Sequence, residues 1–214
     1  EAGYDGIELN GFMIKKMPPI VKILTKMAGM PVGNGGKLDW KKLMGQSGLS
    51  VVSVHEDLGS IKRAPEEIIA EAESFGTHYV VITGMHMFDY SDGEAVKTLA
   101  EDLNTAGKRL KEGFDSYWPT ETGADAKIWM RRLGERMKLW HINDRGCRPQ
   151  GKGGSILKSD SMELGYGNMD LEGMSAIAKE NGIDAVVLES HKNWVDKSPV
   201  KSFQLSAEFL NRHF

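Results

Sequence analysis

Short runs of apolar residues alternate along the chain with longer segments in which apolar positions recur every three or four residues. The short runs are rich in Ile, Val and Leu and predict β-strands. They lie at 6–9, 49–55, 79–84, 137–142 and 185–189, and 113–118 is long enough only for the end of a strand. The longer segments predict helices at 20–24, 65–73, 94–112, 126–136, 171–181 and 199–211, with another beginning near Trp40. Strands that alternate with helices predict βα units and a parallel sheet.

Two glycine-containing segments interrupt this alternation. The segment 32–36 predicts a flexible loop, because it follows a helix and not the first strand, where a phosphate-binding turn would stand. The segment 144–161 is rich in glycine and polar residues and predicts a long loop. Asp39 is predicted to cap the helix that begins near Trp40.

The length and the charge of the chain narrow the classes of protein to which it could belong. A chain of 214 residues suits one domain, 1–214. The formal charge of −3 argues against a basic face for nucleic acid. No run approaches the roughly 18 apolar residues of a membrane span, and no signal peptide is visible. Cys147 is the only cysteine, which excludes an intramolecular disulfide and a cysteine-cluster metal site and favours a reducing, cytoplasmic location.

Polar residues stand at the C-terminal ends of the predicted strands. They are Glu8, His55, Asp115, His141 and Glu189. In βα-barrels the active site is built at this end of the strands, so these residues are candidates for it. The alternatives are that Asp115 caps a turn, that His141 is a hydrogen-bonded core histidine, and that Glu8 and His55 lie at the surface.

Six short motifs occur in a recognisable order. They are EAGYDGIE (1–8), LSVVSVH (49–55), FDSYW (114–118), HIND (141–144), ELGYGN (163–168) and VLE (187–189). In this order and at these strand ends they resemble the xylose isomerase-like TIM barrels, the sugar phosphate isomerase/epimerase superfamily. The resemblance covers most of the chain and implies an α/β fold, the (β/α)8 barrel.

The resemblance leaves two parts of the barrel without a counterpart. Residues 6–10 match the second strand, so the first βα unit is missing. Between Glu112 and Phe114 the family carries its fifth strand, the helix after it and the start of the sixth strand, whereas this sequence has only Gly113 there. Either the natural chain is shortened, which would leave open sheet edges, or residues are omitted here. The number of codons between these two positions in the gene distinguishes the alternatives.

The resemblance also implies a cation site at the barrel mouth. Matching the motifs residue by residue assigns Asp115, His141 and Glu189 as ligands, and the family's strand-five glutamate has no counterpart. Two carboxylates and an imidazole suit one divalent metal, Mn²⁺, Mg²⁺, Co²⁺ or Zn²⁺. In such enzymes the metal polarises a carbonyl while a neighbouring C–H proton leaves. Glu189 would serve both as ligand and as acid–base catalyst.

The implied substrate is a small sugar or polyol. The resemblance assigns substrate contacts to Glu8, His55, Asp144 and Arg145. Asp144 could instead hold the histidine ligand in place, and Arg145 could be a solvated loop charge. The implied function is a metal-dependent sugar isomerase or epimerase. It would act on a keto-sugar, polyol or inosose by proton transfer next to a metal-bound carbonyl, as a monomer or a homo-oligomer.

Two other functions stay open. Without the strand-five glutamate, epimerisation by two carboxylates is not possible as the family performs it, so a degenerate barrel could bind a sugar or a partner without turnover. AP endonucleases of the endonuclease IV type share the fold and a His-x-Asn-Asp stretch. Their Asp-x-x-His has Trp118 in place of histidine here, and their Asp-x-His has Met162. These losses and the negative charge weigh against DNA repair.

Overall fold

The computed structural model describes residues 2–16, 18–27, 36–83, 92–107, 112–121, 123–146, 160–191 and 193–214. They form two compact units. One unit is Asp5–Glu112, and the other combines Glu1–Tyr4 with Gly113–Phe214. Each unit is described by itself below.

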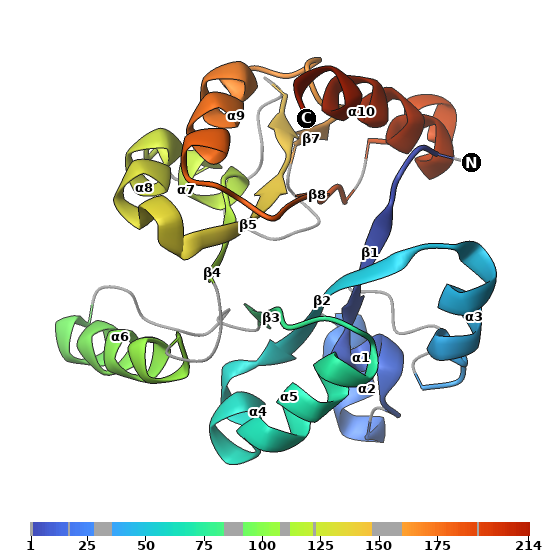
Figure 1. Cartoon of the computed structure of the whole chain (residues 1–214), viewed down its shortest axis with the longest axis vertical. Coiled ribbons are helices and arrows are strands. Elements are labelled where there is room, and N and C mark those ends of the chain that lie inside the picture. The colour runs from blue at the N-terminus through green and yellow to red at the C-terminus, as the bar shows by residue number, and fades with distance from the viewer. Residues whose placement is uncertain are drawn as a thin grey trace. The chain divides into compact units, whose positions relative to one another are not determined.

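The Asp5–Glu112 unit contains a three-stranded parallel sheet of order β1-β2-β3 (Figure 1). Its strands are β1 (Gly6–Asn10), β2 (Ser50–Asp57) and β3 (Val80–Thr83). Its helices are α1 (Gly11–Ile14), α2 (Pro19–Met27), α3 (Trp40–Ser47), α4 (Leu58–Arg63), α5 (Pro65–Ser74) and α6 (Gly93–Gly107). Apolar residues of the sheet, such as Leu9 and Val54, pack with Ile61 of α4 and Ile68 of α5 to form its core.

The second unit is built on another three-stranded sheet, of order β4-β5-β8, in which β5 and β8 run parallel (Figure 1). Its strands are β4 (Glu112–Asp115), β5 (Met137–Ile142) and β8 (Ala185–Leu188). A separate antiparallel pair joins β6 (Asp144–Arg145) to β7 (Ser161–Met162). The helices are α7 (Tyr117–Glu121), α8 (Ala126–Leu133), α9 (Leu171–Glu180) and α10 (Pro199–His213), with short 3-10 turns at Gly134–Arg136 and Val195–Lys197.

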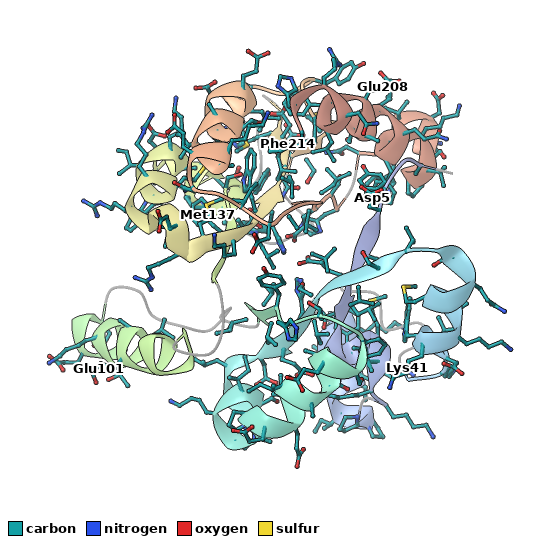
Figure 2. All side chains as sticks on the ribbon, in the orientation of Figure 1. Asp5, Lys41, Glu101, Met137, Glu208 and Phe214 are labelled. Atoms are coloured by element: carbon teal, nitrogen blue, oxygen red, sulfur yellow. The ribbon has the colours of Figure 1, made fainter. Side chains whose placement is uncertain are left out.

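Helices α8, α9 and α10 enclose the core of this unit together with β5. Met137, Trp140 and Ile142 of the strand are fully buried against Met130 of α8 and apolar residues of the other two helices. Met137 lies at the start of β5, whereas Glu208 of α10 faces solvent (Figure 2). Because every second residue of a strand shares a face, the packing of Trp140 and Ile142 turns His141 away from this core.

The first residues of the chain belong to this second unit. The hydroxyl of Tyr4 donates a hydrogen bond to the carbonyl oxygen of Phe203 in α10, at 2.9 Å. The two rings also meet edge to face, with centroids 6.3 Å apart. The N-terminal segment is therefore attached to a helix 199 positions further along the chain.

The predicted strands and most predicted helices are confirmed to within a few residues. Asp39 caps α3, since its Oδ1 accepts the N–H of Lys42 at 3.0 Å. The prediction was wrong for 94–112, because α6 ends at Gly107 and Glu112 already belongs to β4. The predicted loop 144–161 has paired strands at its two ends.

Three helices were not predicted: α1, α4 and α7. Each has six residues or fewer, which is too short for an apolar period to show in the sequence. Tyr117 and Trp118, read as strand residues, instead begin α7. The predicted loop 32–36 lies outside the described residues except for Gly36.

The described strands pair as two three-stranded sheets and one two-stranded sheet, β6-β7, and not as one closed cylinder. Strand β4 runs continuously from Glu112 through Gly113 to Asp115. None of the helices in the described ranges combines the length and apolar character that crossing a bilayer requires. The organisation of 1–214 as a single domain stays a prediction.

Candidate metal centre

Backbone hydrogen bonds bring three strand ends together in the second unit. The N–H of Ser116, just after β4, donates to the carbonyl oxygen of His141 at 3.3 Å. The N–H of Glu189, just after β8, donates to the carbonyl oxygen of Ile142 at 3.1 Å. Because β5 lies between the other two strands, Asp115, His141 and Glu189 are carried to one edge of the sheet.

Those three side chains converge. Each offers one ligand atom, and these atoms all lie within 4.8 Å of one another. Nδ1 of His141 lies 2.8 Å from Oε2 of Glu189. The exposed fraction of the side chain is 7% for His141 and 27% for Glu189, so His141 is buried and Glu189 is partly accessible to solvent.

The carboxyl of Asp115 retains its proton more strongly than an ordinary aspartate. Burial, together with the negative charge of Glu189, raises its pKa to about 7 against the opposing effect of His141. Oδ1 of Asp115 also accepts the N–H of Tyr117 at 2.7 Å, which fixes the carboxyl at the start of α7.

Glu189 behaves in the opposite way. Burial alone would raise its pKa, but the contacts with His141 and His191 outweigh burial and hold the pKa well below its usual range. The two carboxyls therefore divide the charge between them, with Glu189 ionised and Asp115 protonated below neutral pH. Carboxyls close enough to interact commonly separate in this way.

The donor set fits a divalent cation. Two carboxylates and an imidazole within 4.8 Å of one another are ligands that Mn²⁺, Co²⁺ and Zn²⁺ accept, and Mg²⁺ accepts the carboxylates. Three protein ligands leave further positions for substrate or water, which is typical of catalytic sites and not of closed structural ones. The three predicted metal ligands are thus brought together; their binding of a cation stays a prediction.

The side chain of Asp144, a predicted substrate contact, forms hydrogen bonds with the backbone of the loop that follows β7. The buried carboxylate accepts backbone N–H groups of Arg145 at 2.8 Å, Gly165 and Gly167 at 2.9 Å, and Met169 at 3.1 Å. Gly167 is required here, because a Cβ at this position would lie 2.5 Å from the carbonyl oxygen of Arg145. These bonds favour a structural role for Asp144.

Arg145, the other predicted contact in this unit, is held by α7. Its Nε donates to Oε2 of Glu121 at 2.5 Å, and this bond raises the pKa of the guanidinium. Only part of the side chain is exposed, so Arg145 is not the solvated loop charge that was the alternative. Its contact with a substrate stays a prediction.

Glu8 and His55 come together in the Asp5–Glu112 unit. Oε1 of Glu8 accepts the hydroxyl of Ser53 at 2.5 Å, and Oε2 lies 2.8 Å from Nε2 of His55. The register of β1 with β2 shifts between Ile7 and Glu8, which places Glu8 opposite Ser53. Both side chains are largely buried, so neither is the surface residue that was the alternative.

His191 was not among the predicted site residues. Its Nε2 lies 2.9 Å from Oε1 of Glu189, and its ring is tilted against Trp118 with centroids 6.3 Å apart. A signal for it exists in the sequence, since residues two apart in extended chain point to the same side. His191 follows Glu189 at this spacing, but it lies beyond the predicted strand.

Comparison with known proteins finds no matching family model and no matching curated protein. Solved structures do match. A sugar phosphate isomerase/epimerase from Parabacteroides distasonis is 18% identical, with a TM-score of 0.59 over 98% of this chain and 94% of that one. An IOLI protein with a bound zinc atom is 15% identical, with a TM-score of 0.57 over 99% and 88%. An L-ribulose 3-epimerase is 14% identical, with a TM-score of 0.54 over 97% and 93%.

These similarities define the fold. The chain has the α/β fold of the xylose isomerase-like TIM barrels, in an incomplete form whose described strands make two three-stranded sheets and one two-stranded sheet. The predicted fold class is confirmed. At identities this low the similarity extends to the fold alone, so the chemistry has to be argued from the side chains.

Proposed function

We propose that this protein is a sugar isomerase or epimerase that uses one divalent metal held by Asp115, His141 and Glu189. The observation that carries the proposal is the convergence of these three ligand atoms, from three strands, within 4.8 Å. The solved structures with this fold include an L-ribulose 3-epimerase and a zinc-containing IOLI protein, which supports chemistry of the same general class. The substrate would be a small keto-sugar, polyol or inosose.

The chain's own groups have distinct tasks in this proposal. A bound divalent cation would supply Lewis-acid polarisation of a substrate carbonyl. Glu189 is ionised, and because each carboxylate oxygen has two lone pairs it would still be able to accept a proton from the carbon next to that carbonyl while it binds the cation. His141 lies in the buried part of the cluster, with 7% of its side chain exposed, so it limits the access of water from the side of the sheet.

Substrate binding is assigned to Glu8, His55 and Arg145. The Glu8–His55 pair offers a carboxylate and an imidazole to sugar hydroxyls, and Ser53 fixes the carboxylate through its hydrogen bond. Glu8→Gln keeps the size of the side chain and removes its charge. If Glu8 binds substrate, this variant should raise KM for the best sugar with little change in metal affinity. An unchanged KM would remove Glu8 from the site.

The family's second acid–base residue, the strand-five glutamate, has no counterpart in the sequence, which keeps a non-catalytic sugar-binding role as the second candidate. The test is metal analysis of untreated protein, followed by incubation of the Mn²⁺-loaded protein with a panel of ketoses. Interconversion of a ketose that depends on Mn²⁺ and is lost in His141→Ala supports the enzyme. Sugar binding by calorimetry without any turnover would support the second candidate.

A further inference from the structure

The imidazole of His191 is directed at Glu189. Its Nε2 is buried and lies 2.9 Å from Oε1 of Glu189, within hydrogen-bonding distance although the N–H is not aligned on the oxygen. No other polar partner of this nitrogen is found among the described residues. A buried polar nitrogen left without a partner is unfavourable, so the ion-pair contact with the carboxylate is the interaction that favours this position of the ring.

The two oxygens of Glu189 are thereby assigned to different partners. Oε2 lies 2.8 Å from Nδ1 of His141, on the side of the candidate ligands. Oε1 is occupied by His191, which is not one of the three residues whose ligand atoms lie within 4.8 Å of one another. A carboxylate held at one oxygen in this way offers only the other to a cation.

The ring of His191 is held in turn by α7. It lies against Trp118, with centroids 6.3 Å apart and planes 34° apart. Trp118 meets the ring of Tyr117 edge to face, with centroids 5.2 Å apart. Tyr117 is fully buried, and its hydroxyl oxygen accepts the N–H of Asp160 at 2.7 Å. The ring of His191 is therefore held in one position by its packing on Trp118, which itself packs on the buried Tyr117.

We propose that His191 is a positioning residue of the candidate metal centre, holding Oε1 of Glu189 so that the cation is bound through Oε2 alone. The inference rests on the proposed function, because it concerns how a proposed ligand is oriented. Groups that contact a metal ligand without touching the metal fix the orientation of that ligand, and their loss typically weakens metal affinity about 10–100-fold. Binding through one oxygen also leaves a coordination position for substrate that a two-oxygen carboxylate would take.

Two substitutions separate the contact with Glu189 from simple packing. His191→Phe keeps the ring against Trp118 and removes the N–H, whereas His191→Gln keeps an N–H donor and removes the ring. The same exchange at the exposed His78, His78→Phe, is the matched control. Each protein is titrated with Co²⁺, and both the dissociation constant and the visible absorption of the bound ion are measured.

The proposal expects His191→Phe to bind Co²⁺ about 10–100-fold more weakly, with weaker visible absorption because the released oxygen also coordinates and raises the coordination number. His191→Gln should stay close to the parent protein in both measurements. A His191→Phe protein with the parent's affinity and spectrum would overturn the proposal, as would a His191→Gln protein as impaired as His191→Phe. Parent-like Co²⁺ binding by Asp115→Asn would instead overturn the proposed metal site itself.

Discussion

Nδ1 of His141 lies 2.8 Å from Oε2 of Glu189, although 48 positions separate the two residues in the chain. The contact follows from the parallel pairing of β5 with β8, in which Ile142 lies opposite Leu188. A slip of one residue in this pairing would turn one of the two side chains to the opposite face of the sheet. The candidate site is therefore fixed by the same register that buries Trp140 and Ile142.

Replacing Asp115 by Asn tests the ligand assignment. The amide keeps the shape of the side chain but lacks the charge that attracts a cation, so Mn²⁺ affinity should fall by at least the roughly 10–100-fold that loss of a group supporting a ligand costs. Isothermal titration of the purified variant measures this directly. Asp196→Asn is the control, because that aspartate is exposed and pairs with the exposed Lys201. Equal affinities in the two variants would contradict the assignment.

Metal affinity should depend on pH because Asp115 has to lose its proton before it can bind a cation. Its pKa is raised to about 7, so below neutral pH the apparent affinity should fall about tenfold for each pH unit, and above it the affinity should level off. Calorimetry in buffers of different ionisation enthalpy would show about one proton released per metal bound near pH 6. An affinity constant from pH 5 to pH 8 would contradict this.

The metal-free protein should lose stability as the pH rises from about 4 to about 7. In this window the unfolded chain ionises Asp115 while the folded protein keeps its proton, so the unfolded state is favoured, by a few kcal/mol in total. Glu189 acts in the opposite sense, because its lowered pKa gives stability above its usual pKa that is lost on further acidification. Thermal unfolding of protein treated with chelator measures the effect, and Asp115→Asn should remove the Asp115 contribution.

Gly167→Ala should destabilise the second unit. The added Cβ would lie 2.5 Å from the carbonyl oxygen of Arg145 and would also press on the buried carboxylate of Asp144. A cost of about 1–3 kcal/mol is expected from such overpacking. The control is Gly45→Ala in α3, where nothing lies within 4 Å and stability should rise by up to about 1 kcal/mol. Denaturant unfolding of both variants provides the comparison, and equal effects would be inconsistent with the close approach.

The fold could be predicted from the sequence where local signals agree. Strand β5 was predicted with the bounds it has, because Met137–Ile142 combines apolar residues with clear polar flanks. Helix α10 begins as expected at Pro199, after Ser198 whose side chain accepts the N–H of Lys201. The pairing of β6 with β7 had no local sequence signal, because each strand has two residues and the pairing is made between segments far apart in the chain.

The candidate site was predicted in part for a similar reason. Asp115, His141 and Glu189 stand at strand ends, and parallel strands bring such ends to one edge. The hydrogen bonds of Asp144 were not predicted, because its partners Gly165, Gly167 and Met169 lie more than twenty positions further along the chain. His191 follows Glu189 at the two-residue spacing of extended chain, but it lies beyond the predicted strand, so that spacing was not used to predict it.

The bond between Tyr4 and Phe203 has a consequence for biosynthesis. During translation Tyr4 is synthesised 199 residues before its acceptor, so this part of the N-terminal segment must wait for α10 to be made. The unit that carries the candidate ligands can then close only late in synthesis, after the Asp5–Glu112 segment has emerged. A premature stop ahead of α10 would leave both Tyr4 and the apolar face of β5 exposed to chaperones and proteases.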